Sequence, residues 1–284
     1  MKPHVENVIP DKFLTGDSYL SPAAPARLFG PILPTMSFIA RLFLGPVLWL
    51  CGRARFGRCD DAAWVYASVW VTDILERMGG RIEVKGMDAI DAAGGPCVFV
   101  ANHMSTLETF TLPAIIRPRR PVTFVVKESL TTMRLFGPVM RSRDPIVVGR
   151  KNPRDDLVRV LIEGEDRLAR GVSVIVFPQS TRSPGFDPAA FNSIGVKLAR
   201  RADVPIVPIA LKTDIWGSGK RVKELGKIVL SLPVHYQFAP PMRVEGQGRE
   251  THAAICEYIG EHVARWQRED GCNPPMALPA GEAS

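Results

Sequence analysis

PCVFVANHMSTLE, residues 96–108, decides the fold, because a short apolar run leads into a polar turn and then into a helical pattern. The run PCVFVAN (96–102) is typical of a strand that is buried on both faces, as in a parallel sheet. The polar residues that follow include a histidine and a glutamate. A strand, a loop and a helix in this order indicate an α/β protein in which the loop carries chemistry.

Strand and helix patterns alternate on both sides of this stretch, which predicts a mostly parallel central sheet flanked by helices. A helix is expected after Asn152-Pro153, where a capping residue, a first-turn proline and two acids coincide. Ala254 to Trp266 mark a last helix, and the residues after Gly271 are expected to be disordered. The other predicted strands are 81–87, 121–127, 144–150, 172–178, 204–211 and a late edge strand, 227–238, broken at Pro233.

Two apolar runs precede the sheet, at 35–51 and 62–75, and predict an N-terminal pair of membrane-associating helices. The first run contains Arg41 and Pro46, and an arginine at a spanning helix's centre costs about 2.5–3.5 kcal/mol. We therefore expect both helices to lie in one leaflet, with packing on the core or a full crossing by the first run as alternatives. The predicted division is 1–79 for the irregular segment and membrane helices, 80–270 for the α/β domain and 271–284 for the tail. Deletion of residues 1–79 is expected to release the protein from membranes.

Composition limits the classes of function. The 284-residue chain has a formal charge of +7, which suits nucleic acid, an anionic membrane or a phosphorylated substrate. Five cysteines, an odd number without C-x-x-C spacing, argue against a disulfide framework or a zinc site and favour a reducing, cytoplasmic setting. The first twenty residues have no apolar core typical of a cleaved signal peptide. The basic runs 117–120 and 141–143 lack interleaved aromatics, so no nucleic-acid partner is expected.

Three polar motifs each follow a predicted buried strand: ANHMSTLE, GRKN and PQSTRS. If those strands are parallel, their carboxyl ends share the sheet edge where α/β proteins bind ligands. His103 and Glu108 lie five positions apart and would diverge by ~140° on one continuous helix. They can meet only if His103 precedes the helix and the chain turns back over its first turn. A carboxylate bonded to one ring nitrogen would leave the other free to accept a proton.

These motifs resemble the conserved blocks of the glycerolipid acyltransferases, the family of 1-acyl-glycerol-3-phosphate acyltransferases. NHMSTLE looks like the family's N-H-x-x-x-x-D motif. PVTFVVKESL resembles the family's lysine segment, and IVVGRKN resembles its second block. FPQSTRS is similar to the third block, F-P-E-G-T-R-S, and VPIVPIAL to the fourth. The blocks occur in the family's order over about residues 80–215. The N-terminal pair of apolar runs also resembles the family's membrane-anchoring part.

The resemblance implies an O-acyltransferase that moves a fatty acyl group from acyl-CoA or acyl carrier protein to a lysophospholipid hydroxyl. It implies His103 as general base and Glu108 as the group that orients it. No metal or cofactor is expected beyond the donor substrate. Two departures stand out: Glu108 replaces the motif's aspartate, and Gln179-Ser180 replaces Glu-Gly. The expected acceptor-binding residues are Lys127, Arg150, Gln179, Ser180, Thr181, Arg182 and Ser183.

The two departures keep other hypotheses open, namely a lipid-binding or tethering relative without turnover, or an acyltransferase for another lyso-lipid. Two other motifs give weaker evidence of function. The G-K pair at 216–221 does not fit a phosphate loop, and His252 with Cys256 is too small a set for a metal site. No G-x-S-x-G elbow is present. The expected location is the cytoplasmic face of a membrane, monotopic or peripheral, with a membrane lipid as partner. Acceptor headgroup, chain length, donor and oligomeric state stay open.

Overall fold

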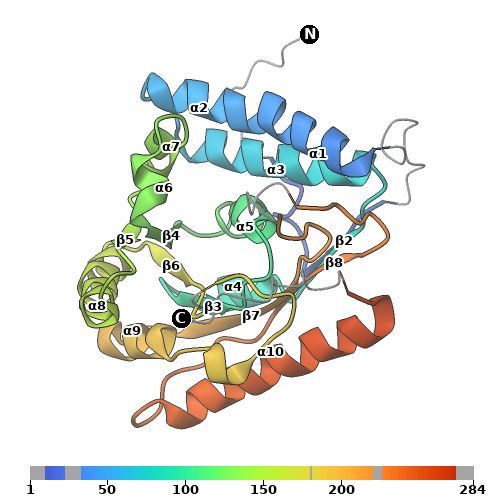
Figure 1. Ribbon diagram of the computed structural model, residues 1–284. Coiled ribbons are helices and arrows are strands. Elements are labelled where there is room, and N and C mark those ends of the chain that lie inside the picture. Colours follow the sequence, from blue (N-terminus) through green and yellow to red (C-terminus); the bar gives the residue numbers. More distant parts are fainter. Residues whose placement is uncertain (1–9, 23–32, 180, 220–225, 273–284) are drawn as a thin grey trace, which may run out of the picture.

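Eight strands in the described part of the chain form one central sheet (Figure 1). The computed structural model describes residues 10–22, 33–179, 181–219 and 226–272. The strands lie in the order β1-β2-β8-β7-β3-β6-β4-β5 across the sheet. Their bounds are β1 Ser18–Leu20, β2 Ile82–Lys85, β3 Val98–Ala101, β4 Val122–Lys127, β5 Ile146–Val148, β6 Ser173–Val176, β7 Ile206–Lys212 and β8 Val234–Phe238.

The sheet is mostly parallel, as predicted. β7, β3, β6, β4 and β5 all run in one direction, so their carboxyl ends meet at one edge. β8 is antiparallel to β7 and parallel to β2, and β1 is antiparallel to β2. β3 and β6 are buried at every position, which accounts for their continuous apolar sequence.

The prediction of an edge strand at 227–238 is wrong in both its length and its position. β8 covers only Val234–Phe238 and lies inside the sheet, between β2 and β7. Pro233 stands just before the first paired residue, so it removes no N–H group from the ladder and does not force an edge position. Ile228 forms an isolated bridge with Trp216 instead.

The other predicted strands lie within their predicted ranges or one residue beyond them. β1 was not predicted, because three residues are too few to display an alternating pattern. The predicted helix after Asn152 is α8, Pro153–Ala169, and the Asn152 side chain caps it by accepting a bond from the Arg154 N–H. The tail predicted after Gly271 falls almost wholly outside the described residues.

Helices cover both faces of the sheet (Figure 1). On one side, α10 packs against β7 and α9 against β3. On the other side, α5 lies next to the sheet with α3 over it, and α1 and α2 form the outermost layer. Gly195 permits the close approach of α9, since a Cβ there would lie 2.6 Å from Val100 Cγ2. The helices are α1 Pro34–Leu42, α2 Leu48–Arg55, α3 Asp61–Arg77, α4 Asp88–Ala92, α5 Leu107–Ile116, α6 Glu128–Thr132, α7 Gly137–Arg141, α8 Pro153–Ala169, α9 Ile194–Ala202 and α10 Arg249–Asp270.

The first apolar run forms one kinked helix. α1 and α2 are joined by a π-helical turn, η1, over Phe43–Val47. Gly45 leaves helical geometry there and Pro46 has no N–H to donate, which explains the kink. One face of this helix is buried, while Met36, Leu44 and Leu48 are among the exposed apolar side chains on its other face.

The expected pair of membrane-associating helices is right only in part. Of the described helices, Pro34–Arg55 alone is long and apolar enough to cross a membrane by length and composition. The second apolar run forms α3, which is capped by Asp60 and buries ten of its 17 residues between the outer helix and α5. Its apolar residues therefore stabilise the core, which was the alternative expectation. The domain boundary predicted at residue 80 stays a prediction.

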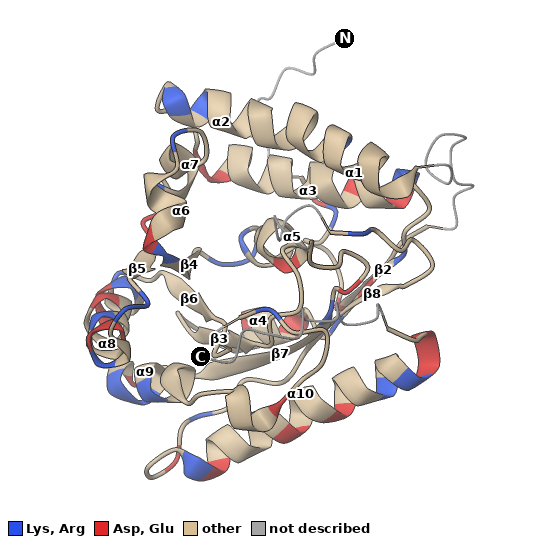
Figure 2. Cartoon of the chain, viewed as in Figure 1, with Lys and Arg blue, Asp and Glu red and all other residues tan. Residues whose placement is uncertain are grey.

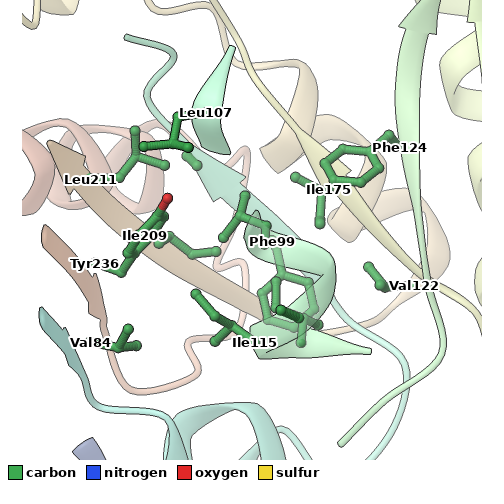
Figure 3. Packing of buried hydrophobic residues seen from close by; sticks show 14 of the residues in the cluster. Val84, Phe99, Leu107, Ile115, Val122, Phe124, Ile175, Ile209, Leu211 and Tyr236 are labelled. Atoms are coloured by element: carbon green, nitrogen blue, oxygen red, sulfur yellow. The ribbon is translucent and has the colours of Figure 1, made fainter. Parts of the chain in front are cut away.

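The core on the α5 side of the sheet is continuous with the strands that carry the site (Figure 3). Phe99 of β3 and Phe238 of β8 make an edge-to-face contact at 6.5 Å between ring centroids. Tyr236 on β8 is almost fully buried, and its hydroxyl bonds the hydroxyl of Thr111 on α5. Side chains from the helix and from neighbouring strands thus hold α5 in a fixed position on the sheet.

Candidate active site

The loop between β3 and α5 is tied to the neighbouring strand by Asn102. Its side-chain amide donates to the carbonyl of Leu211 at 2.8 Å and accepts from the Leu211 N–H at 2.9 Å. Asn102 is fully buried, so no solvent competes for these bonds. This clamp to the end of β7 fixes the point at which the chain leaves the sheet and presents His103.

His103 lies in this loop, and the chain turns back so that its ring meets the first turn of α5. His103 Nδ1 is 2.8 Å from Glu108 Oε1. The His103 ring also stacks on Phe177, with 4.5 Å between ring centroids. Its side chain keeps 17% of its surface exposed, whereas the Glu108 side chain has none. One end of the imidazole is therefore held in the protein while part of the ring remains open.

Glu108 is a buried carboxylate with many hydrogen-bond donors around it. Its Oε1 accepts from the backbone N–H groups of Met104 and Ser105 at 2.8 and 2.9 Å. The hydroxyls of Ser105 and Thr213 lie 2.9 and 2.6 Å from Oε2. Burial on its own raises the pKa of the Glu108 carboxyl, but the interactions with His103 and the bond from Thr213 outweigh it and hold the pKa below its usual range. Glu108 is therefore ionised at neutral pH.

The ionised state of Glu108 decides which nitrogen of His103 carries the proton. A carboxylate only accepts hydrogen bonds, so the Nδ1 that faces it must be the N–H donor. The neutral ring then has its lone pair on Nε2, and within the described residues Nε2 forms no hydrogen bond. An imidazole in this tautomer, backed by a carboxylate, can remove a proton from a hydroxyl group.

Residues after β6 hold the backbone of His103 from the other side. Gln179 is buried, and its Oε1 accepts from the His103 N–H at 2.6 Å. The Ser183 N–H donates to the His103 carbonyl at 2.9 Å. Gln179 was predicted as an acceptor-binding residue, but its side-chain oxygen is directed at the protein backbone. This contact makes it a residue that positions the loop.

Arg182 reaches the same loop from the segment after β6. Its guanidinium bonds the hydroxyl of Thr106, the residue just before α5. The positive group therefore lies at the start of the helix that carries Glu108, at Thr106, which is three residues after His103 in the sequence. Thr181 is exposed beside it, and Ser180 lies outside the described residues. The structure thus brings together His103, Glu108, Gln179, Arg182 and Ser183.

Lys127 and Arg150 share the sheet edge with His103 but are not in contact with it. Lys127 ends β4 and is exposed. Arg150 follows β5, with φ of 59° and its N–H bonded to Asp156. β5 is three strands away from β3, or roughly 14 Å at the usual strand spacing of ~4.8 Å. Of the predicted cations, Arg182 is the one that the fold places at the histidine loop.

The basic runs at 117–120 and 141–143 bind within the protein. Arg117 and Arg143 both pair with Asp61 at the start of α3. Arg119 bonds Asp91, and Arg120 bonds the carbonyls of Ile90 and Gly95. These arginines fasten helices and loops together, which explains their density in the sequence without an external partner.

Sequence reasoning missed several residues that build the site. Ser105 lies inside the quoted motif, but only the fold shows that its N–H and hydroxyl both face Glu108. Thr213 is 105 residues from Glu108 and had no local signal beyond its position after a predicted strand. Phe177, which stacks on the His103 ring, looked like an ordinary strand residue.

No metal centre is apparent in the part of the chain that the structure describes, where no group of three or more His, Cys, Asp or Glu side chains is placed to hold an ion. His252 and Cys256 are 3.7 Å apart on α10, and the His252 ring stacks with Phe191 at 6.1 Å. Their contact is consistent with helix packing.

Comparison with known proteins gives matches along most of the chain. Residues 81–212 match the family model described as Acyltransferase. A 1-acyl-sn-glycerol-3-phosphate acyltransferase from Pseudomonas aeruginosa is 31% identical over 252 residues, covering 88% of this chain and 87% of that protein. The 1-acyl-sn-glycerol-3-phosphate acyltransferase of Escherichia coli is 28% identical over 180 residues, covering 62% and 70%.

A solved structure shares the fold. The crystal structure of the 1-acyl-sn-glycerophosphate (LPA) acyltransferase from Thermotoga maritima superposes with a TM-score of 0.59 at 20% identity. The match covers 82% of this chain and 94% of that chain. The likeness therefore shows a shared fold over most of this chain.

Proposed function

Because the chain belongs to the 1-acyl-sn-glycerol-3-phosphate acyltransferase family, we propose that it esterifies the free hydroxyl of a lysophospholipid. As a member of this family it is an O-acyltransferase. The proposed acceptor is a 1-acyl-glycerol-3-phosphate-like lipid. The proposed donor is a fatty acyl thioester, either acyl-CoA or acyl carrier protein.

The observation that carries the proposal is the 2.8 Å contact between His103 Nδ1 and the fully buried Glu108. In the proposed reaction, His103 Nε2 removes the proton from the acceptor hydroxyl. Glu108 keeps the ring in the reactive tautomer and stabilises the imidazolium that forms. Asn102 and Gln179 keep the loop in place during this change of charge, because Asn102 bonds Leu211 on the neighbouring strand and Gln179 accepts from the His103 N–H.

The acceptor oxygen then attacks the carbonyl carbon of the thioester. A new C–O bond forms and the C–S bond breaks, and the departing thiolate takes the proton from the His103 imidazolium. The products are a diacylated phospholipid and a free thiol, so protons and electrons balance. The step needs no cofactor or metal, because the thioester is already activated, and no acyl-enzyme intermediate.

We assign the acceptor phosphate to Arg182, supported by its position at the loop that carries His103. A guanidinium offers two parallel N–H donors, which suit a phosphate group. Lys127 and Arg150 are further candidates that the lipid headgroup or the phosphates of CoA would reach from the same sheet edge. Thr181, Ser183 and Ser180 remain candidate hydroxyl ligands.

A lipid-binding relative without turnover is the alternative function. A histidine without a carboxylate partner would favour this alternative. Glu108 is one methylene longer than the family's aspartate, but its carboxylate still contacts His103, the N–H groups of Met104 and Ser105 and the Thr213 hydroxyl. An acyltransferase for a different lyso-lipid stays a second possibility, motivated by Gln179 in place of the family's glutamate. Gln179 is buried against the loop, so its substitution bears on positioning more directly than on headgroup choice.

We also propose attachment to a membrane, at the cytoplasmic face and without crossing it. The support is an apolar ridge on the outer face of the α1–η1–α2 helix. Arg41 is the one charged residue of this helix before the basic residues at the α2 end (Figure 2). It is kinked and one-third of it is buried in the protein, which favours a helix lying in the interface. The ridge consists of Leu33, Met36, Phe43, Leu44, Leu48 and Phe56.

The test is a transfer assay on the full chain, followed by mass spectrometry of the lipids. Oleoyl-CoA and an oleoyl carrier protein are offered with lysophosphatidic acid and with lyso-lipids of other headgroups. We expect acylated product with the wild type, most with lysophosphatidic acid, and none above background with His103→Ala. If both proteins form no product with every donor and acceptor, the proposed function is wrong and the lipid-binding alternative gains support.

A further inference from the structure

Two arginines line an open groove between the outer helix and α3, and the proposed reaction does not use them. Arg41 comes from α1 and Arg77 from the last turn of α3. The other walls are apolar: Ala40, Leu44, Trp70 and Ile74. The groove has a volume of about 360 Å³. We call it the α1–α3 groove.

The positive charge of the groove is not neutralised by the protein. Within the described residues, neither Arg41 nor Arg77 forms an ion pair with a carboxylate, and Arg41 donates a hydrogen bond to the Ser37 hydroxyl at 3.2 Å. The acids nearest along α3 are committed elsewhere. Asp73 and Glu76 both pair with Lys12, at 2.8 and 2.6 Å. The groove thus presents two cations to a ligand.

The apolar wall lies directly beside these cations. Gly45 lets the outer helix come close to Trp70, since a Cβ at this position would lie 3.1 Å from the indole ring. Leu44 is 75% exposed and belongs to the ridge proposed to face the membrane. A ligand that fills the groove must therefore combine an anionic group with a hydrocarbon portion, and it must be able to arrive from the lipid phase.

We propose that the α1–α3 groove binds one anionic phospholipid, with its phosphate between Arg41 and Arg77 and an acyl chain along Leu44 and Trp70. The site accounts for an arginine in the middle of an apolar helix, because a phosphate partner offsets the cost of holding that charge near lipid. It deepens the proposed membrane attachment and rests on it. None of the elements that form it contributes a residue to the pair of His103 and Glu108.

The test uses fluorescence quenching of the full chain in uncharged detergent micelles. The protein is titrated with phosphatidylglycerol whose acyl chains carry bromine, which quenches a nearby indole. We expect a saturable loss of tryptophan emission in the wild type and most of that loss to disappear in Trp70→Phe. Arg41→Gln and Arg77→Gln should each raise the half-saturating lipid concentration about tenfold or more, the usual loss for a charge-assisted bond.

Three controls separate a site from general attraction. Arg55→Gln removes the same charge from an exposed position on the same helix, outside the groove, and should shift the titration less than threefold. Ala40→Phe fills the groove without changing charge and should abolish saturable quenching. Phosphatidylcholine with the same brominated chains should quench much less, because its headgroup has no net negative charge.

The proposal is overturned if Arg55→Gln weakens quenching as much as Arg41→Gln does, or if Trp70→Phe leaves the saturable quenching intact. Equal quenching by phosphatidylcholine would overturn it as well. Acyl transfer measured on the same preparations keeps the two proposals apart. A protein that binds the brominated lipid but transfers no acyl group contradicts only the proposed reaction, and the reverse result contradicts only the groove.

Discussion

Replacement of Glu108 by glutamine tests the catalytic reasoning most directly. The amide has nearly the same shape as the carboxylate, and its oxygen can still accept from the backbone N–H groups of Met104 and Ser105. The same oxygen faces His103 Nδ1, so the NH₂ group takes the place of Oε2, beside the hydroxyls of Ser105 and Thr213. The His103 tautomer is kept, but the side chain no longer carries the negative charge that stabilises the imidazolium formed when His103 takes the proton.

The size of the effect follows from what the residue contacts. The Glu108→Gln variant loses the charge-assisted hydrogen bond to His103, which typically contributes about 1.5–3 kcal/mol of free energy. General-base catalysis as a whole contributes about 10²–10⁴-fold. Because His103 keeps its free Nε2, we expect only the loss of the charge-assisted bond, a fall in kcat of about 10- to 150-fold. The KM for the lyso-lipid should change less than about threefold, because the Glu108 side chain has no exposed surface with which to touch substrate.

Alanine is the wrong substitution for this purpose. In the structure, the loss of the carboxylate leaves the buried N–H groups of Met104 and Ser105 without their acceptor. Each such group costs about 1–3 kcal/mol, and a domain has only about 5–15 kcal/mol to lose. Glu108→Ala is thus expected to be substantially destabilised.

The assay follows release of the free thiol from acyl-CoA at saturating lyso-lipid, with thermal unfolding monitored in parallel. Glu163→Gln on α8 is the matched control, since that glutamate lies far from the site and pairs only at 3.9 Å with Arg159. It should retain wild-type kcat. A Glu108→Gln protein that unfolds like the wild type and keeps more than a tenth of its kcat would refute the role given to the carboxylate.

Other predictions concern substrate binding, pH, packing and membrane contact. Arg182→Lys should raise the KM for lysophosphatidic acid about tenfold in steady-state kinetics, because a point charge replaces a bidentate fork. The lowered pKa of Glu108 means that its stabilising contribution is complete above the ordinary value of about 4.3 and is lost as pH falls through the lowered one. Urea midpoints of the wild type should thus fall more steeply below pH ~5 than those of Glu108→Gln. Gly195→Ala should destabilise by about 1–3 kcal/mol in urea unfolding, since its Cβ would lie 2.6 Å from Val100. Leu44→Asp should reduce binding to sedimented vesicles at least severalfold, because a charge replaces an apolar side chain on the ridge.

Each of these has an outcome that contradicts it. An unchanged KM in Arg182→Lys would show that the acceptor phosphate is bound elsewhere. Parallel urea curves for the wild type and Glu108→Gln would mean that the carboxyl gains nothing from its donors. A neutral Gly195→Ala would mean that α9 moves freely on the sheet. For the membrane, Val158→Asp on α8 is the matched control, because Val158 is exposed and apolar but outside the ridge; equal loss in both variants would contradict the proposed face.

Local sequence patterns were sufficient to predict the central strands and the start of α8. Buried strands such as Val98–Ala101 have continuous apolar sequence, and the start of α8 has its capping asparagine and proline. The order of polar motifs after these strands was enough to place His103 and Arg182 on one sheet edge. The contact between His103 and Glu108 required a loop before the helix, and the structure has this loop.

Long-range pairing could not be predicted. Nothing within residues 234–238 indicates that the strand lies between β2 and β7, because that position depends on partners about 150 and 25 residues away in the chain. The same holds for Thr213, which completes the shell around Glu108, and for Asp61, which pairs with Arg117 and Arg143. Apolar content also could not distinguish α3, which is buried, from the outer helix, which exposes a ridge.

The position of α3 has a consequence for any attempt to prepare a shortened, water-soluble enzyme. This helix packs against α5, and α5 carries the carboxylate of the site. Removing residues 1–79 would delete α3 together with the apolar ridge, and it would also delete β1, which pairs with β2. Failure of such a truncation to sediment with vesicles would then report unfolding as readily as loss of attachment. The membrane contact has to be weakened by substitutions on the ridge, with the rest of the chain left in place.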